Sequence, residues 1–368
     1  MGTNNHTLLK EIEQYSEKIL TNEAVYYDKN NIFPEDIIQY FFKQNIFELL
    51  LKNVDDYKDF LQIIKIVSKC FASVGSILLT QGAFGIWPIY KFGTDSQKNR
   101  YLQNLLNGNI FASFALHEPD SGSDIDCLKT VAKKYQNGWK IRGNKTFISN
   151  APISSLFFIV AKIENKDDIG IFLVDRNISE LYISSPEDKI GIKALPVSNL
   201  YLDNVVISED KLLGNSLSGK KYVTDIMNKI KLSISAQAIG IAQASLEKGL
   251  IYANYTRRFG QRLIDLTDNQ FQLAELDTYI TAADSLLNQI IEKEENNSLK
   301  ISMIKLFASD VAIKTTETII QMSGGYGYMK DNDIERYARD AKVTAIYGGS
   351  SSTQKKIISL PWVKNERK

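Results

Sequence analysis

Cysteine is scarce in this chain, and an excess of charge of either sign is missing. The 368 residues include two cysteines, Cys70 and Cys127, which are not in a CxxC spacing. This count argues against a disulfide framework and against a zinc site, so no metal site is predicted. The 44 basic residues are balanced by 43 acidic ones, which gives a net charge of +1. A balanced charge provides no field that would steer the chain onto nucleic acid or an anionic membrane surface.

Long apolar runs and targeting signals are also missing. No uninterrupted apolar run reaches the roughly 20 residues that span a bilayer. The N-terminus has no basic flank that leads into an apolar run, and Glu11, Glu13 and Glu17 argue against a transit peptide. Because unpaired cysteines also suit a reducing compartment, we expect a cytoplasmic protein.

What the chain does contain is two changes of pattern, which divide it into three predicted domains. Residues 1–110 place apolar side chains at helical spacing and predict an N-terminal helical domain. Residues 111–213 form short apolar segments between turn signals and predict a β domain, built as a small barrel or sandwich. Residues 214–368 return to helical spacing, with steps of 3 and 4 from Leu273 to Ile290 and from Ile304 to Met322, and predict a four-helix bundle. The predicted fold class is mainly α with a central β domain.

Two segments of the predicted β domain have the residue types of a ligand-binding turn. The segment ALHEPDSGSD, residues 115–124, ends in small residues that let backbone N–H groups approach a bound ligand closely. The segment GNKTFISN, residues 143–150, follows after a strand-like interval. Taken alone, the first segment is equally well explained as a plain Pro-Asp-Ser-Gly turn, and the second as a strand with Phe and Ile turned inward.

Two further segments in the C-terminal region belong to the same pattern. They are QMSGG at residues 321–325 and RDAK at residues 339–342, although two glycines at a helix end are also a routine C-cap. With all four segments the chain resembles the acyl-CoA dehydrogenase superfamily of flavoproteins over roughly residues 90–355. The resemblance implies the acyl-CoA dehydrogenase fold, FAD as cofactor, and an acyl thioester of CoA or of a carrier protein as substrate. It also implies a flavoprotein or oxygen as electron acceptor, and a homodimer or homotetramer.

The resemblance further implies which residues contact the cofactor and the substrate. Phe147 and Ser149 align with the aromatic and hydroxyl residues that flank the central flavin ring, where a hydroxyl donates to N5, and Glu118 is implied to be structural. The residues implied to lie along the substrate are Ser123, Lys231, Tyr347 and Gly348. The residues implied to bind FAD are Phe114, Leu116, His117, Ser123, Phe147, Ser149, Arg257, Arg258, Phe259, Gln270, Gln321, Gly324, Gly325, Ser350 and Ser352.

His117 is a departure from the family, since it stands where most relatives have Thr or Ser. It is one of two histidines in the chain, and a lone histidine is more often a satisfied core group than a catalyst. It is nevertheless a candidate donor to the flavin pyrimidine edge. Because histidine titrates near neutral pH, it is also a candidate acid or base.

The largest departure concerns the catalytic base. Gly348 stands where short- and medium-chain members carry the glutamate that removes the substrate α-proton, and Ile230 stands where other members place it instead. Without a carboxylate that reaction should be severely slowed. The glycine also predicts an enlarged pocket, in which a substrate with a hydroxyl or amine beside the reacting carbon would fit.

Three contacts on the adenine side of the implied FAD site are also altered. These alterations affect the expected FAD affinity or the oligomer that completes the site. Each altered position nevertheless has a residue of the expected type nearby. The positions are Thr256 for an arginine, with Arg257 and Arg258 following; Thr267 for a glutamine, with Gln270 following; and Ser352 for a glutamine, with Gln354 following.

Three functions are compatible with these observations. The favoured one is an FAD-dependent dehydrogenase that oxidises a hydroxy- or amino-acyl thioester on a carrier protein, because an alcohol proton is far more acidic than a thioester α-proton and a weak base suffices. The second is a flavin monooxygenase of the same fold, which uses oxygen and needs no glutamate. The third is a non-catalytic family member, which would retain little FAD on purification.

Overall fold

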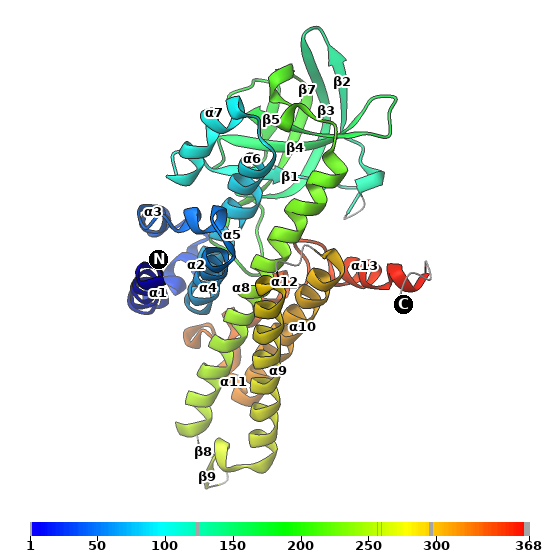
Figure 1. The fold of residues 1–368 in the computed structure, drawn as a ribbon. Coiled ribbons are helices and arrows are strands. Elements are labelled where there is room, and N and C mark those ends of the chain that lie inside the picture. The colour runs from blue at the N-terminus through cyan, green and yellow to red at the C-terminus, as the bar shows by residue number, and fades with distance from the viewer. Residues whose placement is uncertain (1, 123–124, 256, 259, 294–296, 364–368) are drawn as a thin grey trace.

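The computed structural model describes residues 2–122, 125–255, 257–258, 260–293 and 297–363. Figure 1 shows the sheet domain at one end, the N-terminal helices to one side, and the long C-terminal helices extending away from the sheet. The protein is mostly helical with a curled sheet in the middle of the chain, which confirms the predicted fold class.

The N-terminal helices are short, and their apolar faces meet in one core. Phe41, Phe47 and Phe60 are fully buried there. Helix α7, the last of the N-terminal helices, begins with a capping box. Thr94 Oγ1 accepts a hydrogen bond from Gln97 N at 3.2 Å, and Gln97 Oε1 accepts one from Thr94 N at 3.1 Å. The elements are α1 Gly2–Tyr15, η1 Ser16–Leu20, α2 Thr21–Asn30, α3 Glu35–Lys43, η2 Ile46–Leu51, α4 Val54–Cys70, α5 Ala72–Thr80, η3 Gln81–Ile86, α6 Trp87–Phe92 and α7 Asp95–Leu106.

The elements α5, η3 and α6 form one continuous helical stretch, Ala72–Phe92, which we call the central helix. By length and composition this stretch could cross a membrane, so the expectation that no segment of the chain is long and apolar enough was wrong. In the structure 89% of its apolar window is buried inside the protein. Packing in the core therefore accounts for its composition.

The sheet is mixed, and it has a core of its own. Strand β4 pairs in parallel with β1 and β2, whereas β5–β4, β2–β3, β3–β7 and β6–β7 are antiparallel. Trp139, Phe157 and Phe172 lie in a buried cluster separate from the core of the helices. The strands are β1 Ala112–Ala115, β2 Val131–Tyr135, β3 Gly138–Ser149, β4 Leu156–Ile163, β5 Ile169–Asp175, β6 Leu181–Ile183 and β7 Val197–Ser208.

The C-terminal helices pack around α10, which contacts α8, α9 and α12. The predicted seam from Leu273 to Ile290 is buried throughout, and on α10 the seam is buried from Ile304 to Thr315 and half-buried at Thr318 and Met322. Figure 1 shows α13 pointing away from the rest of the chain. The elements are α8 Gly219–Tyr255, β8 Arg257–Arg258, β9 Gln261–Arg262, α9 Thr267–Glu292, α10 Ser298–Ser323, α11 Gly325–Tyr328, α12 Ile334–Thr344 and α13 Ser351–Val363.

Candidate active site

A buried ion pair ties the loop after β1 to strand β3. Glu118 is 2% exposed, and its Oε1 accepts a hydrogen bond from Lys145 Nζ at 2.6 Å and from Thr130 N at 3.0 Å. Lys145 also donates to the Leu116 carbonyl at 3.1 Å. Burial lowers the pKa of Lys145 to about 8. Burial raises the pKa of Glu118, but Lys145 and the other donors outweigh it, so the net shift is downward. Glu118 therefore has the structural environment that the resemblance implied.

Phe147 lies on a bulge of β3 and is the most distinctive side chain of the GNKTFISN segment. Its backbone is left-handed, with φ of 56°, and the pairing of β3 with β7 shifts register between Lys145 and Ile148. Its N–H donates to Asn199 Oδ1 at 3.0 Å, and its side chain is 65% exposed. Such a backbone costs a bulky residue about 1–3 kcal/mol, and residues strained in this way cluster at functional sites. The bulge thus presents a large aromatic face outward, as a flavin contact requires.

The hydroxyl groups of these two segments provide a test of whether a flavin fits here. Ser121 Oγ and Thr146 Oγ1 are buried, and neither has a hydrogen-bond partner among the described residues. An unpaired buried hydroxyl costs about 1–3 kcal/mol, which a ligand with a polar edge would remove. Ser149 is half-buried at the end of β3, and its carbonyl accepts a hydrogen bond from Ser113 Oγ at 2.7 Å. These residues fit the flavin that the sequence implies, whereas Ser123 lies outside the described residues.

His117 is exposed rather than a satisfied core group. Its carbonyl accepts a hydrogen bond from Thr146 N at 2.9 Å, which fixes the backbone of the loop to β3. Partial burial and the charge of Lys145 lower the pKa of His117, and the opposing effect of Glu118 is smaller. The imidazole is therefore neutral at physiological pH, with one nitrogen able to donate and the other to accept.

The central helix joins the β-domain half of the site to the C-terminal half. Phe84 stacks on Phe114 of β1, with ring centroids 5.2 Å apart. One turn earlier, Thr80 Oγ1 accepts a hydrogen bond from Asn150 Nδ2 at 2.9 Å. Another turn earlier, Ser76 contacts α8. Because residues four apart lie on one face of a helix and about 6 Å apart along it, these three contacts place the end of β3 close to α8.

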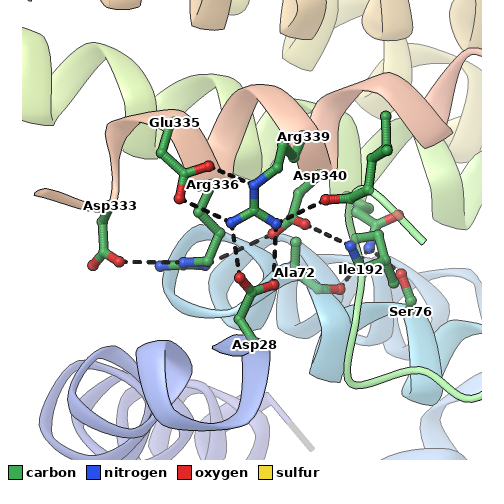
Figure 2. Close-up of polar contacts among 11 residues, drawn as sticks. Asp28, Ala72, Ser76, Ile192, Asp333, Glu335, Arg336, Arg339 and Asp340 are labelled. Atoms are coloured by element: carbon green, nitrogen blue, oxygen red, sulfur yellow. Dashed lines mark hydrogen bonds and ion pairs between the residues drawn. The ribbon is translucent and has the colours of Figure 1, made fainter. Parts of the chain in front are cut away.

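The contact at Ser76 is part of a buried polar cluster, shown in part in Figure 2. Gln237 Nε2 donates to Ser76 Oγ at 2.7 Å and to the Ala72 carbonyl at 2.9 Å, and Gln237 Oε1 accepts a hydrogen bond from the Tyr347 hydroxyl. Burial raises the pKa of Tyr347, so the phenol stays neutral and acts as a donor. The cluster thus holds Tyr347, one of the implied substrate residues, against the central helix.

The turn after Tyr347 is built from two glycines with left-handed backbone. Gly348 and Gly349 have φ of 65° and 94°. Lys305 Nζ donates to the Gly349 carbonyl at 2.7 Å, and Gln354 Nε2 donates to it at 2.8 Å. Gln354 is fully buried on this turn, so its amide supports the turn from inside the chain.

The space beside Gly348 is already filled, which corrects the expectation of an enlarged pocket. A Cβ atom at position 348 would lie closer than 3.0 Å to Cδ1 of the buried Ile234 and 3.8 Å from Cγ2 of Ile230. The two positions at which the resemblance implies a glutamate, 348 and 230, therefore lie close together. Neither carries a carboxylate in this chain, and the volume between them is apolar.

Two buried lysines lie next to this volume, between α8 and α10. Lys231 Nζ donates to Ser302 Oγ at 3.1 Å, and Lys305 Nζ donates to the Gly349 carbonyl, as described above. Each of the two amines therefore donates to a neutral oxygen. Burial lowers the pKa of Lys231 to about 8. Burial and then the charge of Lys231 lower the pKa of Lys305 to about 7. Both amines are therefore partly neutral near physiological pH.

The helix that leads into Tyr347 is anchored by a network of charges, shown in Figure 2. Arg339 of α12 lies between Asp28 of α2, at 2.7 Å, and Glu335 of its own helix, at 3.0 Å. The next residue, Asp340, accepts a hydrogen bond from Ile192 N at 2.6 Å. Burial raises the pKa of Asp340 to about 6. The network ties α12 to the N-terminal helices and to the loop before β7.

The described residues implied on the adenine side come from separate elements, namely β8, α9, the end of α10 and the start of α13. Gly324 ends α10, where its N–H donates to the Ile320 carbonyl at 3.0 Å, and Ser350 Oγ accepts from Thr353 N at 3.3 Å at the start of α13. Gln270 Nε2 donates to the Ile264 carbonyl at 2.9 Å. The remaining residues with a described environment, which are Arg257, Gln321, Gly325 and Ser352, are exposed. Thr256, Phe259 and the side chain of Arg258 lie outside the described residues.

Several residues of the site were missed from the sequence. Ser76, Thr80 and Phe84 are spaced four apart, which is a signal for one helical face, but nothing local says what that face contacts. Gln237 stands alone as a polar side chain of this length among small and apolar neighbours, which marks it as buried and partnered.

Comparisons with known proteins agree with this geometry. Family models described as acyl-CoA dehydrogenase N-terminal, middle and C-terminal domains match residues 3–109, 113–205 and 218–360. An acyl-CoA dehydrogenase of Bacillus subtilis is 33% identical over 95% of both chains. The structure of butyryl-CoA dehydrogenase from Megasphaera elsdenii superposes with a TM-score of 0.92, 25% identity and coverage of 99% of both chains. The prolyl acyl carrier protein oxidase AnaB shares the fold, with a TM-score of 0.91, 24% identity and coverage of 98% of both chains. The chain belongs to the acyl-CoA dehydrogenase family of FAD-dependent oxidoreductases.

Proposed function

We propose that this enzyme oxidises a short acyl thioester that carries a hydroxyl or amine beside the reacting carbon. The observation that supports the proposal is the apolar contact of Gly348 with Ile230 and Ile234, at the meeting point of the family's two glutamate positions. With no carboxylate at that point, the substrate must have a proton that leaves more readily than a thioester α-proton. When bound, FAD supplies the hydride acceptor.

The packing around Tyr347 supports a short and polar acyl group. Ile234 fills the space beside Gly348, and the hydrogen bonds among Ser76, Gln237 and Tyr347 occupy the adjoining core. A long alkyl chain would have to displace a buried, satisfied polar cluster, and each unpaired group would then cost about 1–3 kcal/mol. A hydroxyl or amine can instead exchange hydrogen bonds with the cluster.

We infer that Lys231 takes up the substrate proton. It is adjacent to Ile230 on α8, and its pKa of about 8 leaves roughly a quarter of the amine neutral at about pH 7.5. Lys305 is held on the Gly349 carbonyl of the same turn, and burial and then the charge of Lys231 lower its pKa to about 7. Phe147 and Ser149 would orient the ring of the cofactor, and Glu118 keeps their loop in place through Lys145.

A carrier protein is the favoured handle for the thioester. The name of AnaB describes an oxidase of a carrier-bound prolyl group, and its fold is the fold of this chain. Such a substrate is an amino-acyl thioester, the class that the vacated glutamate positions favour here. The electron acceptor is proposed to be a flavoprotein or oxygen.

A second copy of the chain is proposed to complete the adenine side of the site. Large apolar side chains are exposed around the far end of the bundle, which marks an interaction surface. They are Ile251 at 57%, Tyr255 at 83%, Phe271 at 68%, Tyr328 at 75% and Met329 at 56% exposure. They lie on the same elements as, or next to, the implied adenine-side residues Arg257, Gln270 and Gly325, so a homodimer or homotetramer would bring these into contact with the cofactor of a neighbour.

The test compares two short acyl thioesters that carry a hydroxyl or an amine next to the thioester carbonyl with one that carries neither. Purified protein should show the visible flavin band, and anaerobic mixing with lactoyl-, alanyl- and butyryl-thioesters should bleach it faster for the first two. Rapid bleaching by the butyryl thioester would refute the proposal, because no polar substituent would then be needed. Fast oxygen consumption with a hydroxylated product would identify a monooxygenase instead.

A further inference from the structure

The outer surface of the β domain carries a concentrated positive charge that the proposed chemistry does not use. A groove of about 710 Å³ is lined by residues of β2, β3, β4 and the β4–β5 turn. We call it the basic groove because five of its lining side chains are cationic. They are Lys133, Lys140, Arg142, Lys162 and Lys166. Its two carboxylates, Glu164 and Asp167, leave an excess of three positive charges, whereas the whole chain has a net charge of +1.

The carboxylates of the groove do not neutralise most of these cations. Glu164 pairs with Lys133 at 3.1 Å. Asp167 pairs with Lys220 at 3.1 Å, and Lys220 does not line the groove. The amine of Lys140 lies 3.8 Å from the centre of the Tyr135 ring, so its contact there is with an uncharged group.

The register of the strands places like charges side by side. Lys133 of β2 is directly opposite Lys140 of β3, and Arg142 follows two residues later on β3. Like charges in directly opposed positions destabilise a sheet. A cationic arrangement that weakens the fold is readily explained if a partner supplies the opposite charge.

The groove adjoins the loop that carries the implied flavin and thioester contacts. Lys162 donates a hydrogen bond to the carbonyl of Asp126, which lies four residues beyond Gly122. Val131 lines the groove, and its neighbour Thr130 donates to Glu118 of that loop. A partner seated in the groove would therefore lie beside the loop of the active site.

We propose that the basic groove docks a small acidic protein, the carrier that delivers the acyl thioester. The proposal rests on the function proposed above. The cations are spread over three strands instead of converging on one point, and Lys140 and Arg142 lie about 7 Å apart along β3. Carboxylates four apart on a helix are separated by about 6 Å, so an acidic helix matches this spacing better than a single phosphate does.

The test measures binding of a fluorescently labelled, phosphopantetheinylated bacterial acyl carrier protein to the FAD-loaded enzyme. The double variant Lys140→Glu and Arg142→Glu should weaken binding by at least about tenfold at low salt, with a smaller difference at high salt where charges are screened. The matched control is Lys29→Glu with Lys43→Glu, which makes the same charge change on exposed residues of the N-terminal helices and should leave binding unchanged.

Each other outcome decides against the proposal. The proposal fails if the wild type does not bind the carrier protein, or if the groove and control variants weaken binding equally. It also fails if the groove substitutions weaken binding of free coenzyme A or of a random oligonucleotide as much as they weaken binding of the carrier protein, because the groove then recognises phosphates. Lys140→Gln with Arg142→Gln repeats the test without charge reversal if the first variant misfolds.

The same preparations separate this proposal from the proposed function. Bleaching of the flavin band by small-molecule thioesters should be unchanged in the groove variant, since neither substituted residue is assigned to the catalytic site. Normal bleaching with lost carrier binding supports the docking groove. If the carrier binds but no thioester bleaches the flavin band, the proposed function is refuted and the docking groove is not.

Discussion

The packing of Gly348 against Ile234 makes a quantitative prediction for Gly348→Ala. The new Cβ adopts a left-handed backbone, which costs roughly 1–2 kcal/mol, and it meets Cδ1 of Ile234 at less than 3.0 Å. Overpacking of this kind costs about 1–3 kcal/mol. The expected loss of unfolding free energy is therefore the sum, roughly 2–5 kcal/mol.

A double-mutant cycle separates the two contributions. Ile234→Val deletes the clashing Cδ1 and by itself should cost about 0.5–1.5 kcal/mol. In the Gly348→Ala background the same substitution should relieve the clash, which gives a favourable coupling of about 1–3 kcal/mol. The matched control is Ile230→Val, which should show little coupling, because it removes a Cδ1 that is not among the three atoms nearest the new Cβ and keeps Cγ2 at an ordinary 3.8 Å.

The assay is urea unfolding followed by circular dichroism, with midpoints compared at constant slope. If the costs of Gly348→Ala and Ile234→Val add to within about 0.5 kcal/mol, the space beside Gly348 is open and our account of the pocket is wrong. The same cycle prepares a functional test, since Gly348→Glu with Ile234→Val places a carboxylate where relatives have one. This variant should keep FAD and gain oxidation of the butyryl thioester.

Substitutions at three further positions test the surroundings of the site. Glu118→Gln leaves Lys145 buried without its counter-charge and should destabilise the protein by about 3–5 kcal/mol at neutral pH. Since the folded pKa of Glu118 is depressed, its contribution is present above its unfolded pKa and is lost as pH falls through the folded pKa, so acid titrations of wild type and variant should converge. Phe147→Gly should be more stable than Phe147→Ala by about 1–2 kcal/mol because only glycine is unstrained at φ of 56°, and both should perturb the flavin spectrum. Lys231→Met should be more stable than wild type near pH 7, and melting curves should show the difference shrinking as pH rises from about 8 toward 10.5, where the unfolded lysine also loses its proton.

The sequence by itself determined the fold class and the family. Helical and strand spacings are local properties of the chain, so the seam of α9 and the change to short strands were predictable before any contact was known. The segments GNKTFISN and QMSGG identified the family, and the resemblance led to the prediction that Gly348 replaces the usual glutamate.

Only the tertiary structure decided which side chains lie beside Gly348. The sequence predicted a hollow at Gly348, but Ile234, from a helix more than a hundred positions earlier, fills it. The cluster of Ser76, Gln237 and Tyr347 and the basic groove also join segments distant in sequence. Spacing along the chain fixes which residues share a face, but which faces meet depends on packing and strand register, because these are set by contacts between distant segments.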